Sequence, residues 1–321
     1  NSDIGIIRFG RMPVHWGAGM VFNAGMQPTQ FIGATADRLQ YSKQFDSLFL
    51  LGAIESRQEG FIAEQDDTIA GTLGLYYATD RVSAGLYNVY ASQSSEDSSF
   101  GQFTTDLHGA ADFGAVKLET ELAFQYGSGD LNNGLDDVTQ KAFGGLLDAS
   151  LQMDELIAGL NLGYASGDDN LDDKEFKTFS FDQNYDISLM LFDQVLPTLK
   201  PTASNELNQG LETGAARLGN SISNAIYIQP RVAYAVSETF TPEFRVLLAR
   251  AARLSEEETA SNYGIELNLN LNYEPVENFI LRGQAGYLFL GDYFTEYTDP
   301  NFGGSFDSNP YGAEVNFILK F

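Results

Sequence analysis

Hydrophobic and polar residues alternate with a period of two over long stretches of this chain. In segment 265–273, isoleucine, leucine and tyrosine occupy every odd position, and glutamate and asparagine occupy every even position. Successive side chains of a β-strand point to opposite faces, so this pattern predicts a strand with one apolar and one hydrated face. An α-helix would distribute the same residues around its circumference. Segment 116–126 shows the same alternation.

The alternation predicts about fourteen strands, most of them roughly 10–15 residues long. They cover residues 4–11, 36–43, 46–55, 68–79, 82–92, 102–113, 115–127, 141–153, 155–167, 222–236, 239–254, 260–273, 278–294 and 310–321. Strands of that length can cross a bilayer at a tilt, whereas strands of globular proteins average about 5–6 residues. The predicted fold is therefore all-β: a single antiparallel, up-and-down transmembrane β-barrel of roughly 12–18 strands. It forms one domain over residues 1–321.

The predicted connections alternate between short and long. Short turns are expected at 79–82, 113–115, 153–155, 236–239 and 274–278, and long polar connections at 55–67, 92–102, 127–141, 167–221, 254–259 and 291–310. Tight periplasmic turns and long extracellular loops are typical of outer-membrane barrels. A large soluble all-β protein is the alternative, but it has no reason to sort its loops by length.

Composition excludes several other classes of protein. The formal charge is −26, from 18 Lys and Arg against 44 Asp and Glu, which argues against a nucleic-acid partner. Cysteine is absent, so disulfides, thiolate catalysis and cysteine-ligated metal centres are excluded. The longest apolar run, near 47–54, is far too short for a transmembrane helix. We expect no cofactor and no bound metal.

The last strand carries an unbroken apolar stripe that ends on a terminal aromatic residue. The stripe comprises Tyr311, Ala313, Val315, Phe317, Leu319 and Phe321. It resembles the C-terminal signal of Gram-negative outer-membrane barrels, which the barrel-assembly machinery recognises. The resemblance implies an outer-membrane location, with lipid and lipopolysaccharide as surroundings.

A narrower resemblance is scattered along the chain. The segments RFGRMPVHWGAGMVFNAG, ADRLQY, FSFDQNYDISLMLFDQVL and GYLFLGDYF are similar to the alginate-export-type group of outer-membrane barrels. This resemblance implies a channel-like, porin-like fold, and we do not carry over alginate as a substrate. Barrels of that group can be larger, so the sequence leaves open whether strands precede Asn1.

The hydrated face of the predicted strands carries charges of both signs. The candidate pore-lining residues are Arg8, Arg38, Arg231, Arg245, Arg253, Arg282, Glu119, Glu121, Glu243, Glu266 and Glu314. Rings of fixed charge select ions, and the arginines would favour anionic solutes if they cluster at a constriction. The alternative is that these residues form ion pairs across adjacent strands and brace the wall.

The loop at about 168–221 is the longest connection, and long loops are usually functional or disordered. One hypothesis is that Tyr185–Leu199 folds inward and narrows the pore; the other is an extracellular cap. The acidic clusters at 168–173 and 130–137 could bind Ca²⁺, but a solvated acidic surface is the better interpretation. Trp16 is either an interfacial anchor or a loop-packing residue, and His108 is by default a polar lumen residue.

These patterns leave three functional hypotheses. The first is a passive diffusion channel for small hydrophilic, in one version anionic, solutes. The second is an occluded structural or interaction barrel that presents its acidic loops. The third is a hydrolase, which we do not expect, because no nucleophile motif such as GxSxG is present. The sequence does not determine whether the barrel forms a homo-oligomer.

Overall fold

The computed structural model describes residues 4–25, 33–58, 68–94, 99–131, 135–170, 173–193, 221–254, 260–296 and 308–320. In this part of the chain, consecutive strands pair side by side in one antiparallel sheet. The strands are β1 (Ile6–Pro13), β2 (Thr35–Phe45), β3 (Leu48–Gln58), β4 (Thr68–Ala78), β5 (Val82–Ser94), β6 (Ser99–Asp112), β7 (Val116–Leu131), β8 (Leu135–Met153), β9 (Leu156–Ala165), β11 (Ala225–Tyr234), β12 (Phe240–Ala251), β13 (Asn262–Val276), β14 (Phe279–Leu290) and β15 (Tyr311–Leu319). A two-residue strand, β10 (Glu175–Phe176), pairs in parallel with β8.

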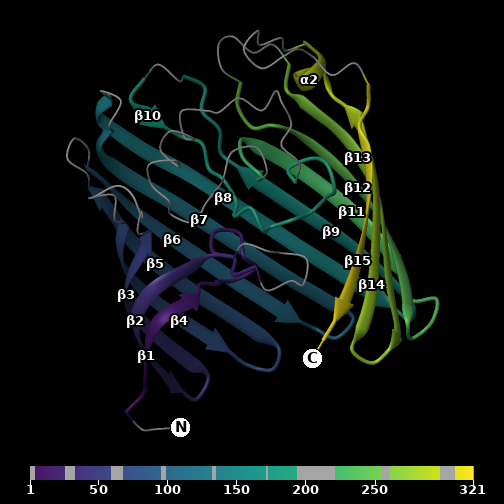
Figure 1. Cartoon of the computed structure of the whole chain (residues 1–321), viewed down its shortest axis with the longest axis horizontal. Helices are drawn as coiled ribbons and strands as arrows, with labels where there is room; N and C mark the ends of the chain where they lie inside the picture. Colours follow the sequence, from purple (N-terminus) through teal and green to yellow (C-terminus); the bar gives the residue numbers. More distant parts are fainter. Residues whose placement is uncertain are drawn as a thin grey trace.

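The sheet curves around a central space, and the two ends of the paired path, β1 and β15, lie at the left and the right of the view (Figure 1). Both chain termini lie at the end that carries the short turns, and β10 and the short helix α2 (Asp292–Glu296) lie at the opposite end (Figure 1). The predicted all-β, up-and-down barrel architecture of about fourteen strands is confirmed. That the whole chain forms one domain stays a prediction.

Side-chain exposure follows the period-two alternation. On β13, Leu269 is 43% exposed, whereas its neighbour Asn268 is buried. The antiparallel register places Leu269 opposite Phe244 of β12, which is also exposed, so apolar side chains form continuous bands on the outer face. On β15, Tyr311 and Phe317 of the predicted stripe are 79% and 73% exposed. A soluble protein would bury such bands between sheets, so their exposure favours a lipid-facing surface.

The rest of the predicted C-terminal stripe is also exposed where the structure describes it. Val315 and Leu319 are exposed on the same outer face, and Phe321 lies outside the described residues. No helix in the described part of the chain is long and apolar enough to cross a membrane.

Some element boundaries differ from the prediction. The expected long connection at 127–141 is wrong, because β7 continues to Leu131 and β8 starts at Leu135. An amide chain supports this extension: Gln102 donates a hydrogen bond to Gln140, which donates to Gln125. The expected strand 278–294 ends early, at Leu290, and the short helix α2 (Asp292–Glu296) follows it.

Two connecting segments lie inside the curve of the sheet. Residues 14–25 follow β1, and residues 177–193 follow β10; both run within the central space (Figure 1). We refer to them as the first inserted segment and the second inserted segment. Together with the inward faces of the strands, they build the candidate site.

Candidate functional site in the barrel lumen

The first inserted segment is held against the wall by an aromatic stack and a carboxylate. Trp16 stacks on Tyr87 of β5, with ring centroids 4.9 Å apart and planes at 20°. Glu121 of β7 accepts hydrogen bonds from the backbone N–H groups of Ala18 (2.6 Å) and Met20 (3.2 Å). Gly85 lies under the indole ring, where a Cβ would be 2.5 Å from it. Trp16 is therefore a loop-packing residue.

The second inserted segment is held from the opposite part of the sheet. Glu266 of β13 accepts hydrogen bonds from the backbone N–H groups of Leu189 (3.0 Å), Met190 (2.9 Å) and Leu191 (2.7 Å). Gln229 of β11 donates a hydrogen bond to the carbonyl of Ile187 at 2.6 Å. The described part of the predicted inward-folding stretch thus contacts the inner wall. Residues 194–199 lie outside the described residues.

The two inserted segments also contact each other. Asn23 N–H donates to the Asp182 carboxylate at 3.1 Å, and Asp182 N–H donates to the carbonyl of Met20 at 2.6 Å. Phe22, Phe181 and Leu191 are buried with other apolar side chains in one core inside the barrel. The lumen is therefore partly filled by a joined pair of loops, which no local sequence pattern indicates.

Burial of Asp182 makes the position of these loops sensitive to pH. Desolvation raises the pKa of Asp182 to about 7, against the opposing effect of hydrogen bonds from Asn184 and Asn23. An aspartate in water has a pKa of about 4. Between about pH 4 and pH 7, Asp182 therefore binds a proton when the segments are inserted in the lumen and releases it when they are withdrawn into water. Stabilisation of the inserted state is therefore complete below pH 4 and decreases as the pH rises towards 7.

We expect the inserted segments to become more accessible to solvent as the pH rises from 5 to 8. The upper value is about one unit above the raised pKa of Asp182. Fluorescence of Trp16, the chain's only tryptophan, reports this change in folded protein through its quenching by acrylamide. The Asp182→Asn variant should show a weaker dependence of quenching on pH in that range. The remaining dependence would come from Asp186 of the same segment, because burial also raises the pKa of Asp186 to about 7. Equal pH dependence in both proteins would contradict the role of Asp182.

Several predicted lumen arginines form ion pairs, two of them between different strands and one within β12. The Arg38 and Glu55 side chains, at most 4% exposed, approach within 3.3 Å. Arg231 of β11 donates two hydrogen bonds of 2.7 Å to Asp148 of β8. Arg245 donates to Glu243, and His108 pairs with Glu119. Of these arginines, Arg38 fits the interpretation of pairs across adjacent strands, whereas Arg231 reaches past β9 to β8 and Arg245 pairs within β12. Glu55 and Asp148, their carboxylate partners, were not among the predicted site residues, although their inward positions follow from the alternation.

Two inward arginines differ from the others. In the sheet register, Arg8 of β1 lies opposite the inward residue Gln40 of β2. Arg282 of β14 lies opposite Asn272 of β13 and Asn316 of β15. Among the described residues, no ion pair is found for Arg8 or Arg282. Glu314 of β15 is exposed on the same inward register. Arg253, in contrast, is exposed beyond the end of β12, so its placement within a strand was wrong.

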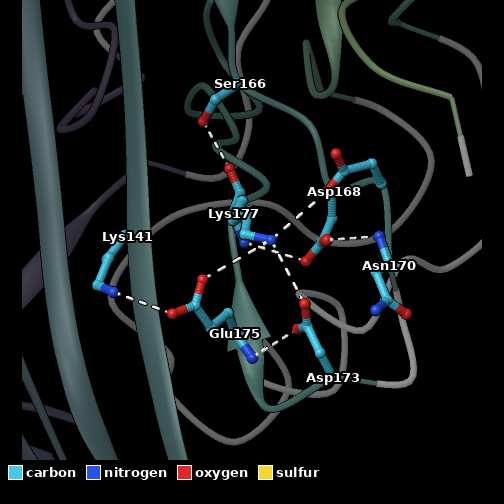
Figure 2. A network of polar contacts seen from close by, with 8 residues as sticks. Lys141, Ser166, Asp168, Asn170, Asp173, Glu175 and Lys177 are labelled. Atoms are coloured by element: carbon cyan, nitrogen blue, oxygen red, sulfur yellow. Dashed lines mark hydrogen bonds and ion pairs between the residues drawn. The ribbon is translucent and has the colours of Figure 1, made fainter.

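The acidic cluster at 168–173 takes part in a network of side-chain contacts at the loop end of the barrel (Figure 2). Lys177 Nζ lies within 3.5 Å of Asp169 and 3.4 Å of Asp173, and Asp168 accepts a hydrogen bond from the Lys177 backbone. Glu175 pairs with Lys141 of β8 at 3.0 Å. Lysine side chains thus neutralise carboxylates of this cluster. No group of three or more potential metal ligands is found in the described residues.

Comparison with known proteins identifies the fold. Neither a protein-family model nor a curated protein matches this chain. Among solved structures, the outer membrane protein OprD from Pseudomonas aeruginosa matches at TM-score 0.50 and 17% identity, over 98% of this chain and 76% of OprD. OccK5 (OpdH) of the same organism matches at TM-score 0.54 and 15% identity, over 100% of this chain and 80% of OccK5. The chain has the fold of an OprD-type outer-membrane barrel.

Other OprD-type barrels support the same assignment. OccK1 (OpdK) of Pseudomonas aeruginosa matches at TM-score 0.54 and 12% identity, over 99% of this chain and 76% of OccK1. The resemblance to Gram-negative outer-membrane β-barrels is therefore confirmed at the level of fold. The narrower resemblance to the alginate-export-type group stays a prediction, as does the role of each inward residue in contact with a solute.

Proposed function

We propose that this protein is a porin-like channel of the bacterial outer membrane, through which small hydrophilic solutes diffuse passively. The observation that carries the proposal is the division of the sheet into an apolar outer face and a polar inner face. Apolar side chains such as Leu73, which is 68% exposed, face outward, and charged and amide side chains face the central space. The inserted segments would narrow the passage and limit the size of the solute.

The charge of the passage supports a preference for anions. Arg38, Arg231 and Arg245 are neutralised by carboxylates, but Arg8 and Arg282 project from the inward register without an ion pair in the described residues. An unneutralised guanidinium attracts carboxylates and can hold them in a bidentate geometry. Two barrels of the same fold were solved with small organic acids, OccK2 (OpdF) with glucuronate and OpdK with vanillate.

Planar-bilayer recording tests the proposal. We expect stepwise currents from the refolded protein, and a reversal potential in a KCl gradient that indicates anion preference. The double variant Arg8→Gln/Arg282→Gln should shift the reversal potential towards cation preference, because two fixed positive charges leave the passage. Arg11→Gln is the matched control, since Arg11 lies on the outward register and pairs with Asp37 at 2.6 Å.

The second candidate is an occluded barrel that acts as a structural or interaction protein. The apolar core between the inserted segments favours it, because Phe22, Phe181 and Leu191 fill part of the central space. Persistent absence of current from correctly refolded protein would favour this candidate over the channel. Without a current, the Arg8→Gln/Arg282→Gln variant would show no shift in reversal potential either.

A further inference from the structure

Two inward carboxylates differ from the charges that a solute would meet. Glu121 of β7 and Glu266 of β13 are each 0% exposed, whereas Glu314 on the inward face of β15 is exposed. Both oxygens of Glu121 and both oxygens of Glu266 accept hydrogen bonds from backbone N–H groups. A solute therefore cannot reach either carboxylate while the inserted segments are in place.

The geometry around Glu266 is that of an anion nest. Three consecutive backbone N–H groups, those of Leu189, Met190 and Leu191, converge on one carboxylate at 2.7–3.0 Å. Successive N–H groups that point to one side form a concave site for a negative charge. Hydrogen bonds to an ionised acceptor are roughly twice as strong as bonds between neutral groups. Glu266 thus makes most of the wall contacts to this turn, and Asn268, which accepts from Leu189 N–H at 3.3 Å, and Gln229 add one each.

Glu121 does the same for the first inserted segment from another part of the wall. It accepts from Ala18 and Met20, and a Cβ at Gly17 would lie 2.5 Å from its carboxylate, so the backbone approaches the wall closely. The contact between Asn23 and Asp182 then joins the two segments across the lumen. Each segment is held both by a wall carboxylate and by its partner segment.

We infer that Glu121 and Glu266 are positioning residues that hold the two inserted segments across the passage and thereby set its width. This inference rests on the proposed channel function. The two carboxylates act on the solute through the loops that they hold, in contrast to an exposed lumen charge such as Glu314. Loss of either should widen the passage, and loss of charge at Glu314 should change only ion preference.

The test compares Glu266→Ala, Glu266→Gln and Glu314→Gln in planar bilayers. We expect Glu266→Ala to raise the single-channel conductance, because the N–H groups of Met190 and Leu191 lose their acceptor and that of Leu189 keeps only its longer contact with Asn268. Glu266→Gln should stay closer to the wild type, since its amide oxygen still accepts a hydrogen bond. Glu314→Gln should shift the reversal potential without a change in conductance. Wild-type conductance in both Glu266 variants, with or without a shift in reversal potential, would overturn the inference.

Hydrogen exchange of the folded wild-type protein supplies a measurement that depends on neither channel activity nor the folding of a variant. The N–H groups of Ala18, Leu189 and Leu191 lie outside the strands, and we expect them to exchange much more slowly than free-loop amides. Exchange at free-loop rates would overturn the inference. If the wild type carries no current but these amides are protected, the channel proposal fails, and the carboxylates still hold the segments.

Discussion

Replacing Arg38 by methionine is expected to destabilise the barrel by about 3–5 kcal/mol, because it removes the guanidinium that faces the buried carboxylate of Glu55. Glu55 lies opposite Arg38 in the register between β2 and β3, and its side chain is 0% exposed. The Thr72 hydroxyl also donates a hydrogen bond to the Glu55 carboxylate. The free energy of unfolding, measured by denaturant titration in detergent micelles, checks this result.

Two further variants separate the ion pair from general damage. The double variant Arg38→Met/Glu55→Leu should recover most of the lost stability, because apolar residues of similar volume can replace a buried pair. Arg11→Met breaks an exposed pair, with side chains 60% and 43% exposed, and should cost about 0–1 kcal/mol. If Arg38→Met and Arg11→Met lose equal stability, the buried pair does not have the assigned role.

The Gly85→Leu variant is expected to displace Trp16 from the wall and to open the lumen. A leucine side chain at this position would overlap the indole ring, whose atoms lie 2.5 Å from the site of the Cβ. Trp16 would lose its stack on Tyr87 and its edge contact with Tyr76, at ring centroid distances of 4.9 and 5.8 Å. An aromatic pair contributes about 0.5–1.5 kcal/mol beyond its buried area. We expect a red shift of tryptophan emission, stronger quenching by acrylamide and a larger single-channel conductance.

A second glycine supplies the control for this substitution. Gly71 of β4 lies on the outer face, where a Cβ would meet no atom within 4 Å. Gly71→Leu adds the same side chain to the same sheet, so its emission spectrum and conductance should match those of the wild type. Identical emission spectra for Gly85→Leu and the wild type would show that the position of the Trp16 ring does not depend on the absence of a side chain at Gly85.

The wall of the barrel could be predicted in detail because its pattern is local. The alternation over 265–273 assigns Leu269 to the outer face and Asn268 to the inner face, and the structure agrees. The boundaries were less accurate where both faces stay polar. At 127–141 the polar residues suggested a loop, but Gln140 extends the sheet by its hydrogen bonds to two strands.

The contents of the lumen were predicted only in part, as one of two hypotheses for Tyr185–Leu199, because they depend on contacts between distant residues. Ala18 and Glu121 are 103 residues apart, and Leu191 and Glu266 are 75 apart. The inward alternation identified Glu121 and Glu266 as facing the lumen, but not that loop backbone would cover them. Asp182 lies in a segment without regular periodicity, so no pattern marked it as the contact between the inserted segments.

The sequence by itself determined which residues face lipid and which face inward, because each strand exposes alternate side chains to opposite faces. It also predicted about fourteen strands paired in chain order, and the structure pairs fourteen strands in that order and adds the two-residue strand β10. Only the tertiary structure decided which inward charges are neutralised, which are covered by loops, and which stay accessible. Those outcomes depend on hydrogen bonds and ion pairs between segments that are distant in the sequence. Neither the hydrophobic period nor the residue types of one segment predict which distant segment it will contact.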